Sequence, residues 1–141
     1  MSQEAIGKEG WVVGADLPSL AKTLSQEKID RYARASGDFN PIHVDPAFAA
    51  RTPFGGTIAH GMLLLAYLSE MLTAAFGQAW LSGGRLKIRF KGAARPKDTV
   101  TIGGRVQRVQ EGHEGRRLWC DVECLNQRGE MLVTGRAEVR L

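Results

Sequence analysis

The pattern of apolar and polar residues predicts one long buried helix between a largely helical first half and a second half of strands. From about His60 to Phe76 the chain is apolar almost all the way round a helix, and only Ser69, Glu70 and Thr73 interrupt it. A helix of this kind is buried in a protein or in a membrane. Because the run is shorter than the roughly 20 residues that a bilayer requires, and because Glu70 lies within it, the pattern predicts burial under a sheet.

Shorter elements precede the long helix. Residues 19–25 predict a first strand, and Ser25 is a suitable N-cap for a helix over residues 26–35. Asp45-Pro46 predicts the cap and first turn of a second short helix that ends at Ala50. Residues 51–56 predict a connector rich in turns, and residues 1–16 predict a loosely held lead-in with Trp11, Val12 and Val13 as candidates for packing on the body.

After residue 82 the period of the pattern changes to two, which is typical of strands. Segments 84–91, 98–106 and 116–125 alternate in this way, and the last strand is expected to turn Met131, Val133, Ala137 and Val139 inward. Gly103-Gly104 predicts a bulge or a close approach of two backbones. Four strands in meander-like succession, preceded by the first strand and the long helix, predict a single α+β domain whose antiparallel sheet wraps around the helix.

Composition narrows the class of protein without identifying a function. The 141 residues suit one globular domain, since 43% are hydrophobic and 24% are charged. The formal charge of +4 would favour anionic ligands only weakly. Binding to nucleic acid is disfavoured because the strand face that carries the basic stripe (Arg85, Lys87, Arg89 and Lys91) contains no interleaved aromatic residues.

The two cysteines are expected to be free thiols. In a strand, Cys120 and Cys124 would lie roughly 13 Å apart, beyond the reach of a disulfide. Two cysteines are also too few for a cysteine-based zinc site. Free thiols favour the cytoplasm, and the acids and glycines of the first 17 residues do not resemble a signal peptide.

Residues 36–61 contain the candidate chemistry. Asp38 and His43 are five residues apart, and Asn40-Pro41 between them disfavours continued helix and turns the backbone. A turn places a carboxylate and an imidazole in one small volume, where they can take a proton from a shared water and return a proton elsewhere. This arrangement predicts general acid and base chemistry that needs no metal.

A second feature follows at the start of the long helix. His60-Gly61 opens the apolar run, so the amide of Gly61 is expected in the first turn, where backbone N–H groups have no partner within the helix. These N–H groups and the helix dipole suit a developing oxyanion.

The segments YARASGDFNPIHVDPAFAA (residues 32–50) and GGTIAHGMLLLAYL (residues 55–68) closely resemble the MaoC-like (R)-specific enoyl-CoA hydratases, which have the hot-dog fold. In looser form the resemblance extends from about Leu24 to the C-terminus. It implies that residues 1–141 form one hot-dog domain and that the protein is a homodimer with its sites at the subunit interface. Coenzyme A, or an acyl carrier protein, would then be part of the substrate, and no cofactor or membrane is implied.

The resemblance also implies a reaction and a set of residues. Asp38 and His43 would be the catalytic pair, and the Gly61 amide would be the oxyanion donor. The reaction would be reversible addition of water across the double bond of a trans-2-enoyl thioester, giving the (R)-3-hydroxyacyl product. Ser36 and Asn40 are assigned to support of the loop.

Simpler roles compete with these assignments. Asp38 alone would be a turn-forming carboxylate, and His43 alone an ordinary half-buried histidine. His60 is more readily explained by helix packing or capping than by contact with substrate. Phe39 and Phe54 are candidates for an acyl pocket or for the core.

Two further features have alternative readings. Glu70 in the buried helix needs a partner, for which the dimer interface is a candidate. The basic stripe suits the phosphates of coenzyme A or an acidic carrier protein, and equally suits a solvated sheet face.

Two other functions remain open at this stage. A hot-dog thioesterase would place an acid near the start of the central helix, but the first acid there is Glu70, about three turns in. A non-catalytic subunit that binds acyl thioesters is the second alternative, and the presence of both Asp38 and His43 argues against it.

Overall fold

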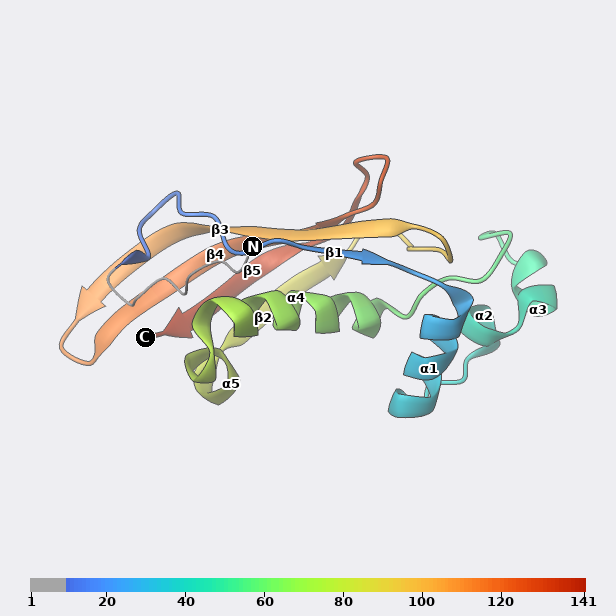
Figure 1. Ribbon diagram of the computed structural model, residues 1–141, viewed down its shortest axis with the longest axis horizontal. Helices are drawn as coiled ribbons and strands as arrows, with labels where there is room; N and C mark the ends of the chain where they lie inside the picture. Colours follow the sequence, from blue (N-terminus) through green and yellow to red (C-terminus); the bar gives the residue numbers. More distant parts are fainter. Residues whose placement is uncertain (1–9) are drawn as a thin grey trace.

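One antiparallel sheet of five strands covers one side of a long central helix (Figure 1). The computed structural model describes residues 10–141. The strands are β1 (Leu20–Thr23), β2 (Arg85–Phe90), β3 (Thr99–Gly112), β4 (Gly115–Leu125) and β5 (Met131–Arg140). Helix α4 (Gly61–Phe76) runs beneath the sheet. The α+β hot-dog architecture expected from the sequence is confirmed.

The order of strands across the sheet is β1-β3-β4-β5-β2, and all neighbouring strands are antiparallel. The expected meander is therefore correct only for β3, β4 and β5. Strand β2 does not pair with β3, which follows it in the chain, but crosses to the far edge and pairs with β5. Alternation along a strand shows which residues share a face, but it does not show which strand lies alongside.

The remaining helices lie at the two ends of α4 (Figure 1). Helices α1 (Gln26–Ser36), α2 (Pro41–Val44) and α3 (Pro46–Ala50) precede α4, and α5 (Gln78–Gly83) follows it. The sequence predicted α1 and α3 to within one residue at each end, and the Ser25 side chain caps α1 as expected by accepting a hydrogen bond from the Lys28 amide. It did not predict α2 or α5, which are too short to show a helical period.

Helix α4 is buried on most but not all of its surface. Its buried residues are Leu63, Leu64, Leu68, Met71, Leu72 and Phe76. Met62, Ala66, Glu70 and Ala74 recur every fourth residue and form an exposed stripe. Glu70 lies on this stripe, with its carboxylate 3.0 Å from the Lys22 ammonium on β1. The partner of Glu70 is therefore within the chain, and no dimer interface is needed to supply one.

The strands bury one face against α4. Val133, Ala137 and Val139 are buried as expected, but Met131 is exposed, because the pairing of β4 with β5 shifts register at Cys124 and Leu125. The predicted irregularity at Gly103-Gly104 is a close approach at Gly104, whose carbonyl accepts a hydrogen bond from the Leu17 amide at 2.9 Å. The bulge itself lies two residues later, between Val106 and Arg108.

The segment before β1 is attached to the sheet. Asp16 forms an isolated bridge with Arg105 on β3, and Trp11 is buried, with its ring centroid 5.1 Å from that of Phe76. The expectation that Val12 and Val13 pack beside Trp11 is wrong: they are 55% and 64% exposed, because the chain turns there and the Ala15 amide donates to the Val12 carbonyl at 3.0 Å. Residues 1–9 of the expected lead-in lie outside the described residues.

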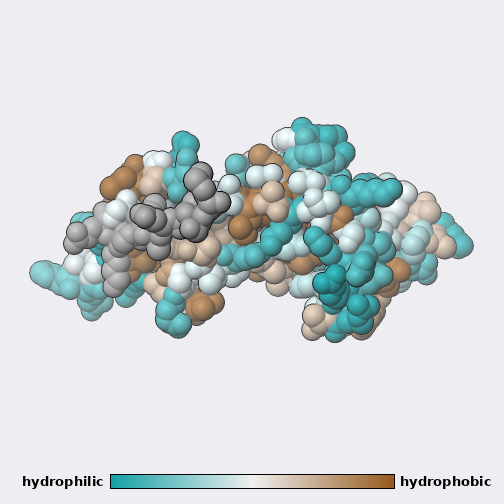
Figure 2. Space-filling view, in the orientation of Figure 1, coloured by the Kyte–Doolittle hydropathy of each residue, from teal (hydrophilic) through white to brown (hydrophobic). Residues whose placement is uncertain are grey.

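The surface, the cysteines and the lengths of the helices also bear on the expectations from the sequence. Hydrophobic residues on the face seen in Figure 1 lie in separate patches among hydrophilic ones (Figure 2). Cys120 and Cys124 are free, as expected, and both are buried. Within residues 10–141, no helix has both the length and the apolar character needed to span a membrane.

Candidate active site

The loop that carries Asp38 begins where α1 ends. Gly37 stops the helix in the left-handed conformation (φ 79°), which glycine adopts without a Cβ clash, and its amide donates to the Ala33 carbonyl at 2.8 Å. Ser36 Oγ then accepts a hydrogen bond from the Asp38 amide at 3.2 Å. The chain therefore leaves the helix with Asp38 held against its last turn.

Asn40 starts the helix that carries His43. Its side-chain oxygen accepts a hydrogen bond from the Ile42 amide at 3.1 Å, and Pro41 occupies the first helical position. The Asp38 carboxylate accepts from the Asn40 amide at 3.2 Å, which is the turn-forming contact weighed for an isolated aspartate. The sequence predicted a simple turn here. The structure instead has a single helical turn, α2, because proline at this position favours a new helix.

His43 is fixed by two contacts at its ring and backbone. Its Nδ1 lies 2.8 Å from the carbonyl oxygen of Ile58, which can only accept, so Nδ1 carries the proton and Nε2 keeps the lone pair in the neutral ring. The His43 carbonyl accepts a hydrogen bond from Gln26 Nε2 at 2.8 Å. Gln26 Oε1 in turn accepts from the Thr57 hydroxyl at 2.6 Å. Gln26 thus joins α1, α2 and the segment before α4.

His60 lies between these parts of the site. It is 2% exposed, and its Nε2 lies 3.0 Å from the backbone carbonyl oxygen of Asp38. Its ring stacks on that of His43, with centroids 3.9 Å apart and planes 26° apart. Although His60 is the N-cap residue of α4, its side chain makes no capping hydrogen bond.

Asp38, His43 and His60 form one cluster. One carboxylate oxygen and one ring nitrogen from each histidine all lie within 4.8 Å of one another. Asp38 is exposed and His43 half-buried, so water can reach the pair. A carboxylate and a basic ring nitrogen at this separation can share one water and exchange protons with it.

The same three side chains are types that bind transition metals. However, the lone pair of an imidazole nitrogen lies in the plane of its ring, and the rings of His43 and His60 are stacked. The lone pairs of stacked rings point along nearly parallel planes, whereas the ligands of one metal ion must point at the same place. The sequence-based expectation of a metal-free site stays a prediction.

The amide of Gly61 is available at the start of α4. No hydrogen bond from this amide is found within residues 10–141. The neighbouring Ala59 is anchored, since its amide donates to the Ala94 carbonyl at 2.8 Å. A Cβ added to Gly61 would lie 2.9 Å from Cε1 of Phe90, so the aromatic ring covers this glycine closely.

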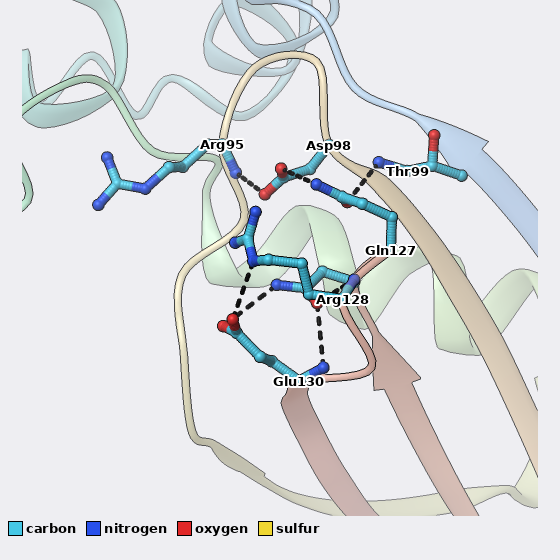
Figure 3. Close-up of polar contacts among 7 residues, drawn as sticks. Arg95, Asp98, Thr99, Gln127, Arg128 and Glu130 are labelled. Atoms are coloured by element: carbon cyan, nitrogen blue, oxygen red, sulfur yellow. Dashed lines mark hydrogen bonds and ion pairs between the residues drawn. The ribbon is translucent and has the colours of Figure 1, made fainter.

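The loop between β2 and β3, which holds Ala59, is itself braced by Asp98 (Figure 3). This buried carboxylate accepts hydrogen bonds from the Arg95 amide at 2.9 Å and from Gln127 Nε2 at 2.8 Å. Gln127 Oε1 also accepts from the Thr99 amide at 3.1 Å. The turn between β4 and β5 therefore supports the backbone that positions the start of α4.

The same turn carries a surface ion pair. The guanidinium of Arg128 donates to Glu130 at 2.9 Å (Figure 3), and this hydrogen bond, together with one from Asn126, lowers the pKa of the Glu130 carboxyl.

The remaining predicted site residues lie on the surface. Phe39 is 58% exposed and Phe54 43% exposed, so neither belongs to the core. The side chains of the basic stripe are also exposed, and none of them forms an ion pair in the part of the chain that the structure describes.

Three contributors to the site were not identified from the sequence. Ile58 acts through its backbone carbonyl, which any residue supplies, so its identity gives no signal. Phe90 was assigned to the apolar face of a strand, and only the crossover of β2 places it beside Gly61. Gln26 was read only as the first residue of a helix.

Comparisons with known proteins agree with this architecture. The family model described as the MaoC like domain matches residues 13–123. The (R)-specific enoyl-CoA hydratase of Aeromonas caviae is 35% identical over 126 residues, which cover 86% of this chain and 90% of that protein. The solved structure of the A. caviae (R)-hydratase involved in PHA biosynthesis superimposes with a TM-score of 0.81 and 32% identity, covering 94% of this chain and 98% of that one.

A longer relative gives a partial match. The 3-hydroxyacyl-thioester dehydratase Z of Mycobacterium tuberculosis is 36% identical over 108 residues, which cover 74% of this chain. The match spans only 61% of the length of that dehydratase.

Proposed function

This chain belongs to the MaoC-like domain family, and we propose that it is a hydro-lyase that reversibly hydrates trans-2-enoyl thioesters to (R)-3-hydroxyacyl thioesters. The proposal rests on the proximity of Asp38 and His43 near the start of helix α4. A carboxylate oxygen of Asp38 and a ring nitrogen of His43 lie within 4.8 Å of each other. The hydratase and dehydratase names of the relatives that match most of this chain support the same class of reaction.

The proposed chemistry uses one water molecule. The water lies between Asp38 and the lone pair at Nε2 of His43, and its oxygen forms a bond to C3 of the enoyl thioester as one proton passes to the pair. The π electrons between C2 and C3 move toward the carbonyl, and C2 then receives a proton from the pair. The sum is addition of H and OH across the double bond.

The Gly61 amide completes the proposed mechanism. Negative charge grows on the thioester oxygen as C3 is attacked, and an N–H fixed at a helix N-terminus stabilises this charge more than it stabilises the uncharged ground state. Its lack of an acceptor within residues 10–141 supports this role. A donor of this kind contributes on the order of 3 kcal/mol to lowering the barrier.

We also propose that the enzyme acts as a homodimer on acyl groups carried by coenzyme A or by an acyl carrier protein. Several large apolar side chains near the site are exposed in the single chain, namely Phe39, Phe48, Phe54, Met62 and Phe90, and a second subunit would cover part of this surface. The unpaired basic stripe suits a phosphorylated carrier. Two buried free thiols support location in the reducing cytoplasm.

The alternative of thioester hydrolysis has less support. The first acid of α4 is Glu70, and its carboxylate is already paired with Lys22 at 3.0 Å, on the exposed stripe of the helix. No acid of α4 is thus placed beside Gly61 to activate water at a carbonyl.

A direct assay separates these functions. Purified protein is mixed with crotonyl-CoA, and the loss of enoyl absorbance is followed together with the release of free thiol. We expect absorbance loss without thiol release, and chiral analysis of the product is expected to show the (R) isomer. Thiol release at the same rate would indicate a thioesterase, and neither signal would leave a binding subunit as the better explanation.

A further inference from the structure

We infer that His60 is a positioning residue of this site: it holds Asp38 and His43 in their relative geometry and does not itself touch substrate. The inference rests on the proposed hydratase function and adds to it a residue outside the catalytic pair. Three observations support it: the hydrogen bond made by Nε2 of His60, the contacts of its ring with two aromatic neighbours, and the absence of a partner for its Nδ1 within residues 10–141.

The first observation is the hydrogen bond from His60 to the backbone of Asp38. The Asp38 carbonyl can only accept, so Nε2 of His60 carries the proton and donates at 3.0 Å. The two residues are 22 positions apart, and this bond ties the loop after α1 to the start of α4. Because it holds the main chain of Asp38, it does not occupy the carboxylate, which accepts from the Asn40 amide and is exposed to water.

The second observation is the position of the ring between two aromatic neighbours. His60 stacks on His43 at 3.9 Å between centroids, and Tyr32 contacts it at 4.8 Å with a tilt of 60°. The stack limits rotation of the His43 ring. His43 is therefore held at Nδ1 by the Ile58 carbonyl and across its face by His60.

The third observation argues against the simpler roles. The Nδ1 atom of His60 is buried and has no hydrogen-bond partner within residues 10–141, and the side chain does not cap α4. A buried nitrogen without a partner is unfavourable. If packing were the whole purpose, phenylalanine would fill the space without that cost, so the gain from an imidazole here lies in the bond from Nε2 to Asp38.

His60 therefore connects the three parts of the proposed mechanism. It bonds to the backbone of Asp38, it stacks on His43, and it directly precedes Gly61. A small displacement of any of these groups lowers turnover, since misplacement by about 1 Å can reduce a rate by roughly 10²-fold.

Two substitutions separate the hydrogen bond from the ring. His60→Phe keeps an aromatic ring for stacking but has no donor. His60→Gln places an amide N–H close to the position of Nε2 but has no ring. We expect kcat for crotonyl-CoA hydration to fall about 10- to 100-fold in His60→Phe and to stay within about five-fold of the native value in His60→Gln.

The Michaelis constant shows, independently of kcat, whether His60 contacts the substrate. Because His60 is buried and does not contact substrate, KM is expected to change by less than about three-fold in both variants. A native kcat in His60→Phe would overturn the inference, as would equal losses of kcat in the two variants or a loss confined to KM.

Amide hydrogen exchange tests the positioning role of His60 without relying on enzyme activity, and therefore independently of the proposed function. Amide hydrogen exchange of residues 38–43, compared with that of β4, is expected to rise at least about five-fold in His60→Phe and less in His60→Gln. If native protein does not hydrate enoyl thioesters, the proposed function fails while this exchange result still tests the positioning role. Equal exchange in native protein and His60→Phe would overturn the positioning role alone.

Discussion

The carbonyl oxygen of Ile58 lies 2.8 Å from Nδ1 of His43, and this single contact sets which nitrogen of the catalytic candidate is basic. A backbone carbonyl cannot donate, so the proton stays on Nδ1 and the lone pair of the neutral ring is at Nε2. The contact is made by main-chain atoms, so the orientation of His43 is determined by the path of the chain before α4.

Removing either member of the pair is expected to abolish most of the activity without unfolding the protein. Asp38→Asn and His43→Ala should each lower kcat for crotonyl-CoA hydration by roughly 10²- to 10⁴-fold, because each removes a proton-transfer group. Both residues lie at the surface end of the site, so far-UV circular dichroism and the melting temperature are expected to change little.

Asp45 offers a matched control for Asp38. It is also an exposed aspartate, and it caps α3 by accepting from the Phe48 amide at 3.1 Å. Asp45→Asn should keep native kcat. Near-native turnover in both Asp38→Asn and His43→Ala would remove the pair from the mechanism.

The packing of Phe90 on Gly61 predicts that a second substitution, at Phe90, restores activity lost by substituting Gly61. In Gly61→Ala the new Cβ would lie 2.9 Å from Phe90 Cε1, so the ring or the helix start must shift. Overpacking of this kind costs about 1–3 kcal/mol, and we expect kcat to fall at least about tenfold through displacement of the amide. Gly61→Ala combined with Phe90→Ala removes the overlap and should recover most of the loss.

Gly83→Ala is the control for this pair, because a Cβ there meets no atom within 4 Å. It should leave kcat and the melting temperature unchanged. Should the double variant be no more active than Gly61→Ala, contact with Phe90 is not the cause of the loss.

Asp98 is expected to be the polar residue whose removal costs most stability. Asp98→Ala leaves the Gln127 amide and the Arg95 N–H without their acceptor in a buried position, so the free energy of unfolding should fall by about 3 kcal/mol. Urea denaturation followed by tryptophan fluorescence measures this. Glu130→Gln, which changes an exposed acid in the same turn, should change the free energy of unfolding much less, because exposed ion pairs contribute little. Equal losses in the two variants would contradict the assigned role of Asp98.

The buried thiols predict a loss of stability in alkali. Burial raises the pKa of Cys120 to about 12 and that of Cys124 to about 11, from an ordinary value of 9.0. At a pH between the ordinary value of 9.0 and the raised pKa of each thiol, the unfolded chain releases a thiol proton that the folded chain keeps. The free energy of unfolding therefore falls as pH rises above about 9, by up to about 1.4 kcal/mol per pH unit for each thiol.

The double variant Cys120→Ala, Cys124→Ala isolates this effect. It should be less stable than native protein at pH 7, because two buried side chains are truncated. Urea denaturation at each pH should show that the difference in free energy of unfolding between native protein and the double variant shrinks from pH 9 to pH 11. A difference that stays constant over that range would show that the thiols do not titrate in this way.

The sequence predicted the parts of the site that are local in the chain. Asp38, Asn40 and His43 lie within one short segment, and turn and capping preferences of aspartate, asparagine and proline act over two or three residues. The order of helices and strands was equally accessible, because a change of hydrophobic period is a local property. The succession of elements predicted a sheet wrapped around the helix, and similarity to a known family identified this arrangement as the hot-dog fold.

What the sequence could not show depends on contacts between distant segments. The place of β2 beside β5, the ring of Phe90 over Gly61 and the bond from His60 to Asp38 each join residues that are remote in sequence. Glu70 was misread for a related reason, since apolar periodicity marked its helix as buried on all sides while the stripe that carries it faces Lys22 and solvent.

The crossover of β2 also bears on how the protein is made. Among residues 10–141, strand β2 pairs in the sheet with β5 alone, so within this part of the chain it has no strand to pair with during synthesis until the chain has been extended through Arg140. Phe90, at the end of β2, cannot settle over Gly61 before then. The start of the central helix is therefore synthesised well before the strand that its final surroundings require.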